Sequence, residues 1–325
     1  MEKINAVITG VGGYVPDYVL TNDELSRMVD TTDEWIMTRI GVKERRILNE
    51  EGLGTSYMAR KAAKQLMQKT GANPDEIDAV VVCTTTPDYH FPSTASILCD
   101  KLGLKNAFAF DLQAACCGFL YSLEVVASLV ASGRHKKVIL VGADKMSSMV
   151  DYSDRATCPI FGDGAGAAVV TEGDELKAIR LTTSSLAEVL YYQRKLEPTP
   201  YIDKEENFEP LVMRGREVFK HAVTSSCKDI RRLLNETGLQ PDDIRYYVLH
   251  QANKRIIDSI RNFLGVEEER VPHNVERYGN ISSAALPALL DELNRGGKLT
   301  KGDKLVFSAF GAGFTTGACV IEWAK

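Results

Sequence analysis

The chain has 325 residues, of which 44% are hydrophobic and 26% are charged, and its formal net charge at pH 7 is −5. This composition is typical of a globular protein of about two domain-sized units, and the negative charge argues against nucleic acid binding. Its apolar runs are shorter than the roughly 20 residues that cross a bilayer, and residues 1–5 lack a signal-peptide core, so we expect no membrane association.

Apolar and amphipathic segments alternate along the whole chain. In the first half the pattern predicts strands near residues 4–12, 78–85, 107–112, 137–143 and 164–171, and helices near 54–70, 93–103 and 116–132. In the second half it predicts strands near 176–184, 245–250, 303–309 and 317–323, and helices near 212–237, 253–264 and 282–295. The strands are continuous apolar runs, as in sheets covered by helices on both faces, so the fold class is α/β.

The two halves of the chain resemble each other. The segment 66–77, which ends a helix at Gly71 and turns at Pro74, recurs at 233–244 with an offset of 238 − 71 = 167 residues. A glycine-rich turn that feeds an apolar strand occurs at 161–170 and again at 310–321. This self-similarity indicates two related α/β halves, which we place at residues 1–172 and 173–325.

Cys116 follows a short apolar strand and opens the predicted helix 116–132. A thiol at a helix N-terminus faces unpaired N–H groups and the positive end of the helix dipole, which stabilise a nucleophilic thiolate. The competing interpretation is a buried core cysteine, which we expect for the other six, Cys117 included. Since no pair of cysteines has the spacing of zinc ligands or of a thioredoxin-like motif, we expect no metal site and a reduced, cytoplasmic protein.

Three segments of the second half place polar groups at turns. His250 ends a predicted strand, at the edge where open α/β sheets hold their sites, and Asn280 lies in a Gly-Asn turn before a helix. The glycine-rich turn 308–314 can present backbone N–H groups to an oxyanion. Each segment alone also fits a structural histidine, a helix cap or an ordinary turn.

Together these segments resemble the β-ketoacyl-acyl carrier protein synthase III family along almost the whole chain. The matching motifs are Asp33-Glu34-Trp35-Ile36, Thr38-Arg39, Ala114-Ala115-Cys116, Gly118-Phe119, Phe161 to Gly166, His250 to Asn253, Gly279-Asn280 and the closing glycine loop. The resemblance implies a thiolase-like fold with helix–sheet–helix–sheet–helix layers. It also implies a decarboxylative Claisen condensation that initiates fatty acid synthesis, in which a short acyl-CoA primer and malonyl-acyl carrier protein give 3-oxoacyl-acyl carrier protein, CoA and CO₂.

The family's site residues carry over position by position. Cys116 is then the acylated nucleophile, His250 and Asn280 complete the triad, and the N–H groups of Cys116 and Ala312 form the oxyanion hole. The positions implied to bind CoA or substrate are Trp35, Arg39, Phe91, Arg155, Arg216 and Asn253. Phe91 matches a residue that a partner subunit inserts at the acyl pocket, which implies a homodimer. Acyl-CoA is a substrate, and no cofactor is implied.

The chain departs from the family at several positions. Ala312 stands where many members have Gly, Thr316 where they have Trp and Arg216 where Asn is common, and residues 174–214 contain no glycine. The primer is therefore the least determined property, and we expect a short chain because Phe91 would plug the pocket. Two alternatives stay open: a specialised relative that passes the acyl group to another acceptor in secondary metabolism, and a non-catalytic acyl-binding subunit.

Two further motifs have competing interpretations. The glycines of segment 10–13 follow a strand, but no helix follows them, which argues against a dinucleotide site. Lys254, Arg255 and Arg261 share one predicted helix beside His250. They form either a solvated helix face or a docking surface for an acidic carrier protein.

Overall fold

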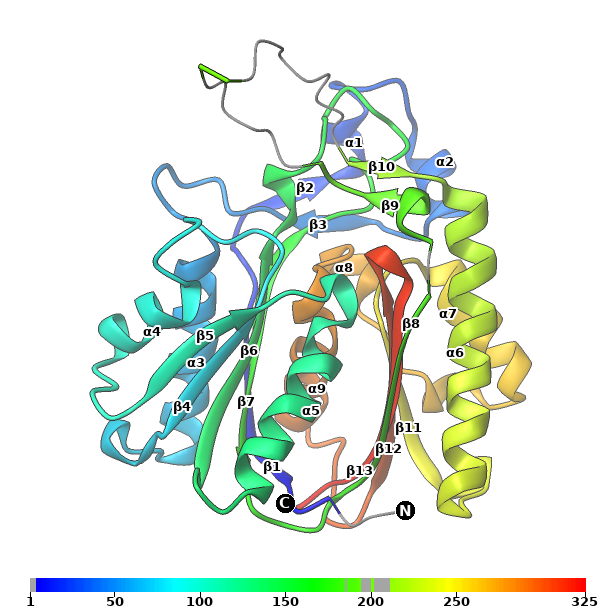
Figure 1. Ribbon diagram of the computed structural model, residues 1–325. Coiled ribbons are helices and arrows are strands. Elements are labelled where there is room, and N and C mark those ends of the chain that lie inside the picture. The colour runs from blue at the N-terminus through cyan, green and yellow to red at the C-terminus, as the bar shows by residue number, and fades with distance from the viewer. Residues whose placement is uncertain (1–3, 185, 194–199, 202–210) are drawn as a thin grey trace.

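The computed structural model describes residues 4–184, 186–193, 200–201 and 211–325, which form five layers (Figure 1). Two central helices separate two sheets, and two helices cover the outer face of each sheet. The central pair is α5 (Gly118–Ala131) and α9 (Ala285–Arg295), and the outer pairs are α3 (Thr55–Thr70) with α4 (Thr94–Leu102) and α6 (Gly215–Thr237) with α7 (Lys254–Leu264). The layered α/β architecture implied by the sequence is confirmed.

The second sheet repeats the strand order of the first. The five-stranded sheet has the order β1-β7-β6-β4-β5 and the four-stranded sheet the order β8-β13-β12-β11. In the first sheet β4 pairs in parallel with β6, and the next two strands across the sheet, β7 and β1, pair antiparallel. In the second sheet β11 pairs in parallel with β12, and the next two strands, β13 and β8, pair antiparallel. The strands are β1 (Val7–Tyr14), β4 (Ala79–Cys83), β5 (Phe108–Leu112), β6 (Lys137–Lys145), β7 (Asp163–Thr171), β8 (Leu176–Thr183), β11 (Ile244–Leu249), β12 (Lys304–Gly311) and β13 (Thr315–Glu322).

The repeated sequence segments form the same local structure. α3 and α6 end at Gly71 and Gly238, whose φ angles of 67° and 71° lie in the left-handed region that glycine adopts without strain. A short 3₁₀ turn that begins with proline follows each, at Pro74–Glu76 and Pro241–Asp243, and leads into β4 or β11. This supports our proposal of two related halves, divided between residues 172 and 173.

The remaining elements are short and were not predicted, because two to seven residues carry too little periodicity. They are β2 (Val19–Thr21), α1 (Asn22–Leu25), α2 (Asp33–Arg39), β3 (Glu44–Arg46), β9 (Leu190–Tyr191), β10 (Val212–Met213) and α8 (Val275–Tyr278). Most of them gather at one end of the sheets, at the top of Figure 1. Across the described ranges, no helix combines the length and the apolar character that crossing a membrane requires.

The glycines of segment 10–13 serve helix packing. A Cβ atom on Gly12 of β1 would lie 2.6 Å from the carbonyl oxygen of Ala62 and 2.7 Å from the backbone nitrogen of Leu66, both in α3. Glycine therefore lets this helix lie directly on the strand, and Ala59, Ala62 and Ala63 keep the contacting face of the helix small. The structure gives these glycines a packing role, in line with the argument against a dinucleotide site.

Candidate active site

Cys116 lies in a strained turn rather than in the first turn of an α-helix. Residues Ala115–Cys117 form a 3₁₀ turn, and α5 begins only at Gly118. Ala115 has a φ of 48°, a left-handed conformation that is unfavourable for a residue with a Cβ atom. The predicted helix start at Cys116 was therefore wrong by two residues.

The end of β12 packs directly against this turn. A Cβ atom on Gly311 would lie 2.9 Å from the backbone nitrogen of Cys116 and 3.0 Å from that of Cys117. Only glycine permits this approach, which places Ala312, the next residue, beside the nucleophile in the wall of the same cavity. The two proposed oxyanion donors, the N–H groups of Cys116 and Ala312, thus come from segments in close contact.

His250 directly follows β11 and is only 2% exposed. Its backbone N–H donates to the Ser308 carbonyl at 2.8 Å, and its ring meets the edge of Phe310 with the centroids 5.3 Å apart. Neither ring nitrogen has a hydrogen-bond partner among the described residues. Burial lowers the pKa of His250 to about 3, so the ring is neutral at neutral pH and keeps one free donor and one free acceptor.

Asn280 is fixed by its backbone and by its own side chain. Its N–H donates to the Ile160 carbonyl at 2.8 Å, and its carbonyl accepts from the Gly162 N–H at 3.1 Å. Its side-chain oxygen accepts from the Ser282 N–H at 2.8 Å. Because the amide oxygen is engaged within the turn, the NH₂ group is the end that can act on a substrate.

Burial controls the ionisation of the nucleophile. It raises the pKa of the Cys116 thiol to about 11, although hydrogen bonds from Ser282 and Asn280 act in the opposite direction. The expected helix-stabilised thiolate was therefore wrong for the free protein, in which the thiol is neutral at neutral pH. Cys117, by contrast, is fully buried, and its thiol lies 3.6 Å from the Ala309 carbonyl.

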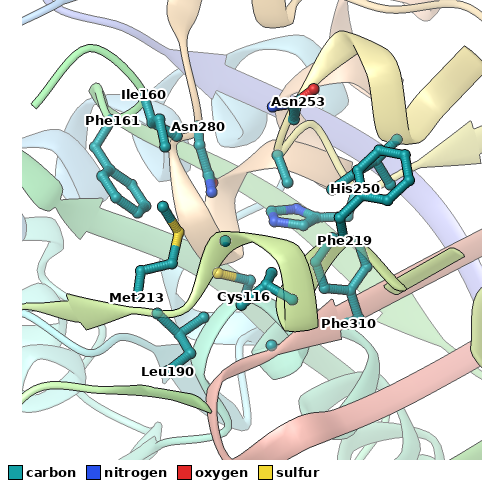
Figure 2. Close-up of a pocket in the computed structure, with 15 residues that line it drawn as sticks. Cys116, Ile160, Phe161, Leu190, Met213, Phe219, His250, Asn253, Asn280 and Phe310 are labelled. Carbon is teal, nitrogen blue, oxygen red and sulfur yellow. The ribbon is translucent and has the colours of Figure 1, made fainter. Parts of the chain in front are cut away.

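Two cavities meet at Cys116. The first encloses about 600 Å³, its open mouth included, and holds Cys116, His250 and Asn280 in one wall. Figure 2 shows the imidazole of His250 and the amide of Asn280 pointing into the same space beside the sulfur. The rest of the wall is mainly apolar, with Ile160, Phe161, Leu190, Met213, Val218, Phe219, Ile256 and Phe310. The second cavity, of about 590 Å³, extends from Cys116 past Thr85, Met146, Met149, Tyr191 and Leu211.

Backbone strain is concentrated at this site. Within the described ranges, three residues other than glycine have a positive φ: Ala115 (48°), Ser282 (53°) and Phe314 (46°). They lie next to Cys116, two residues after Asn280 and two residues after Ala312. Each such conformation costs about 1–3 kcal/mol and persists only where the surrounding packing enforces it.

Three of the positions implied to bind CoA, Trp35, Arg39 and Arg155, lie on or beside α2. Trp35 and Arg39 lie four residues apart on one face of α2, and the Arg155 guanidinium lies 5.6 Å from the Trp35 ring centroid. Arg155 also forms an ion pair with Asp30 at 3.5 Å. Arg39 and Arg216 are exposed.

Asn253 contacts both α2 and the first cavity. It lines the cavity, caps α7 through a hydrogen bond from the Arg255 N–H at 2.8 Å, and donates to the Arg39 carbonyl at 3.5 Å. Gly215, which precedes Arg216, lines the same cavity. Asn253 thus lines the first cavity itself, whereas Arg39 and Arg216 each lie next to a residue that lines it.

The three basic residues of α7 differ in their surroundings. Lys254 forms an ion pair with Asp258, and Arg261 forms one with Glu268 at 3.3 Å. Arg255 is exposed, and its guanidinium lies 5.5 Å from the centroid of Phe219, a residue of the first cavity. Arg255 is therefore the best placed of the three to meet an acidic partner.

Phe91 does not line the cavities at Cys116 in its own chain. Its side chain is 86% exposed, and it does not appear among the described residues that line either cavity at Cys116. The glycine-free segment 174–214 contributes Leu190, Tyr191, Leu211 and Met213 to the cavities, but residues 185, 194–199 and 202–210 lie outside the described part of the chain.

Sequence reasoning missed several residues of this site. Ser282 bonds to Cys116, and the sequence signal was its position two residues after Asn280. The apolar residues of the second cavity, such as Met146 and Met149, carry no local signal, because only the tertiary packing brings them to Cys116.

Among the described residues, no group of three or more His, Cys, Asp or Glu side chains could hold a metal ion.

Two family models and a curated relative match the sequence of this chain. The family model described as 3-oxoacyl-[acyl-carrier-protein] synthase III matches residues 110–187, and that of its C-terminal part matches residues 234–323. The chain is 63% identical to β-ketoacyl-[acyl-carrier-protein] synthase III of Phocaeicola vulgatus, over 99% of this chain and 98% of the relative.

Solved structures give the same result. The 3-oxoacyl-[acyl-carrier-protein] synthase III of Aquifex aeolicus is 40% identical, with a TM-score of 0.91 over 98% of this chain and 100% of the other. The priming β-ketosynthase of the R1128 polyketide pathway is 34% identical, with a TM-score of 0.92 over 100% and 98%. The chain therefore belongs to the β-ketoacyl-[acyl-carrier-protein] synthase III family.

Proposed function

We propose that this protein condenses a short acyl-CoA primer with malonyl-acyl carrier protein and thereby initiates fatty acid synthesis. The observation that carries the proposal is the convergence of Cys116, His250 and Asn280 on one apolar cavity, in which both ring nitrogens of His250 lack protein partners among the described residues. Transfer to a different acceptor is not favoured, because the chain is 63% identical over 99% of its length to a relative named for this reaction.

In the first half-reaction, Cys116 takes the acyl group. With the pKa of the thiol near 11 and that of His250 near 3, both groups are neutral at rest, so a proton must leave the sulfur as it attacks. We infer that His250 accepts this proton while the new C–S bond forms, and that it then protonates the departing CoA thiolate. The oxyanion formed on the way accepts hydrogen bonds from the N–H groups of Cys116 and Ala312.

In the second half-reaction, the malonyl thioester loses CO₂. The electrons of the broken C–C bond form an enolate, whose oxygen accepts hydrogen bonds from the N–H of His250 and the amide of Asn280. Two preorganised donors in a dry cavity stabilise this charge far better than water would. An amide is suited to the second position because it has no acidic or basic form near neutral pH. The enolate carbon then attacks the acyl-Cys116 carbonyl and displaces the Cys116 thiolate, which takes up a proton from solvent to restore the resting thiol.

We assign the first cavity to the pantetheine arm of each substrate and the second to the acyl chain. Asn253 lines the first cavity, and the exposed residues Arg39 and Arg216 lie next to its lining, so cationic and amide groups are available there for the phosphates of CoA. The second is lined by Met146, Met149 and other apolar side chains. We expect short primers, because a partner's Phe91 that enters this cavity would shorten the space for the acyl chain.

We further propose a cytoplasmic homodimer. β5 is an edge strand of its sheet, Phe108 on it is 41% exposed, and the exposed Phe91 belongs to the loop between β4 and α4. An unpaired strand edge with apolar side chains is a ready surface for a second copy. Sedimentation that finds an active monomer would contradict this assembly.

Intact-mass spectrometry tests the reaction. The protein is incubated with a panel of acyl-CoA thioesters, and the acyl-enzyme is then chased with malonyl-acyl carrier protein while CO₂ is measured. Asn280→Ala should slow the chase by about 10²–10³-fold and leave acylation largely intact, whereas His250→Ala should slow both steps. A wild-type acyl-enzyme that never reacts with malonyl-acyl carrier protein would refute the proposed function.

A further inference from the structure

Asp144 is a fully buried carboxylate behind the active site. It lies near the end of β6, its exposure is 0%, and no ion pair of it occurs among the described residues. One oxygen accepts from the Thr85 N–H at 2.6 Å and from the hydroxyls of Thr85 and Thr84 at 2.9 and 3.2 Å. The other accepts from the Ser283 hydroxyl at 2.6 Å and the Ser283 N–H at 3.1 Å. Neutral donors therefore satisfy both oxygens.

The Ser283 side of this network leads directly to Asn280. Ser283 follows Ser282, the strained residue whose N–H holds the side-chain oxygen of Asn280. The turn also packs on β6, where a Cβ atom on Gly142 would lie 2.4 Å from the Ser283 carbonyl oxygen. Asp144 thus secures the residue after the strained position, where a loss of contacts would allow the turn to relax.

The other side of the network anchors the carboxylate to the wall of the second cavity. Thr85 lines that cavity together with Ala115 and Cys116. The charge of Asp144 raises the pKa of the Cys116 thiol and so opposes formation of the thiolate. Asp144 therefore does not activate the nucleophile, and any favourable effect of Asp144 on the reaction must act on another step.

We propose that Asp144 is a positioning residue for decarboxylation: it holds the Ser282–Ser283 turn so that the Asn280 amide stays aimed at the enolate oxygen. The inference rests on the proposed function. The second half-reaction then depends on Asp144, a carboxylate that contacts no substrate.

The test compares acylation with condensation in Asp144→Asn. An amide of the same shape keeps one oxygen, which the three donors of Thr84 and Thr85 retain, and turns its NH₂ group toward the donors of Ser283. We expect kcat for condensation to fall by about 10- to 100-fold, with acylation changed less than about threefold and KM for malonyl-acyl carrier protein unchanged. Ser283→Ala, which removes one donor and keeps the backbone N–H, should lower condensation by about threefold to tenfold in the same pattern.

Asp163→Asn is the matched control. Asp163 is equally buried, lies on the neighbouring strand β7, and accepts from the Ser147 N–H and hydroxyl and from the Leu48 N–H. Its substitution should lower the melting temperature but keep the wild-type ratio of the two half-reactions.

Three results would overturn the inference. They are wild-type condensation in both Asp144→Asn and Ser283→Ala, an equal loss of acylation and condensation in them, or the same split in Asp163→Asn. If Asp144→Asn does not fold, Ser283→Ala decides alone. Failure of the wild-type protein to condense would instead refute the proposed function.

Discussion

Gly311→Ala should inactivate the protein through a single added methyl group. The new Cβ atom would lie 2.9 Å from the backbone nitrogen of Cys116, 3.0 Å from that of Cys117 and 3.0 Å from the Thr315 hydroxyl. Since carbon–nitrogen contacts this short are repulsive, the backbone turn at Cys116 and the end of β12 must separate by roughly half an ångström. Overpacking of this kind costs about 1–3 kcal/mol of stability.

The larger effect should fall on acylation. The displaced nitrogens include one proposed oxyanion donor, and Ala312, the next residue, carries the other. Loss of one such donor typically slows the reaction by about 10²–10³-fold. The rate of acyl-enzyme formation, followed by intact mass after rapid quenching, measures this loss directly, and thermal unfolding measures the stability cost.

Gly317→Ala provides a matched control in the adjoining strand β13. Its Cβ atom would lie 2.7 Å from a Leu181 side-chain carbon and 3.1 Å from the Arg180 carbonyl oxygen, away from Cys116. We expect a comparable loss of stability with acylation close to wild type. Acylation at the wild-type rate in Gly311→Ala would refute the argument that the close approach builds the oxyanion hole.

Further predictions concern the nucleophile, the histidine and the docking helix. Cys116→Ala should abolish acyl-enzyme formation and Cys117→Ala should retain it, because Cys117 is fully buried; peptide mapping of the acyl mass checks this. Burial lowers the pKa of His250 from 6.5 to about 3, so its neutral form contributes stability above pH 6.5 that is lost as the pH falls toward 3. The unfolding free energy of wild type relative to His250→Gln should therefore drop by roughly 1.4 kcal/mol per pH unit in this window, and a pH-independent difference would contradict the burial argument. Arg255→Glu should raise KM for malonyl-acyl carrier protein at low ionic strength more than Lys254→Glu does, since Lys254 is already paired with Asp258; equal effects would make this helix face an ordinary solvated surface.

The long periodic segments made most of the fold predictable. Continuous apolar runs gave the strands of both sheets, and glycine at the end of α3 and of α6 marked the point where each helix stops. The family motifs likewise pointed to Cys116, His250 and Asn280 before their geometry was known, and the three lie together as expected. Periodicity and turn chemistry were therefore sufficient for most of the helices and strands, whereas the layered architecture and the three central residues were implied by the family resemblance.

The ionisation of the site was not predictable in the same way. A helix N-terminus favours a thiolate, but the pKa of Cys116 is set by burial, which depends on residues such as His250 and Phe310 that lie 134 and 194 positions away in the sequence. The same holds for Asp144, which reads in the sequence as an ordinary polar residue after a strand and acquires its role only when Ser283 packs against it. Properties that depend on the environment of a group need the packed structure.

The active site combines residues that follow strands of both sheets, which has a consequence for the synthesis of the chain on the ribosome. Cys116 follows β5 of the first sheet, whereas Gly311, which packs against its turn, ends β12 of the second sheet, and His250 directly follows β11 of the second sheet. Because a chain is made from its N-terminus, the thiol exists for much of translation without the partners that bury it. During that interval it lacks the groups proposed to bind the oxyanion and to accept its proton. The proposed catalytic groups are therefore complete only once the second half of the chain has folded against the first.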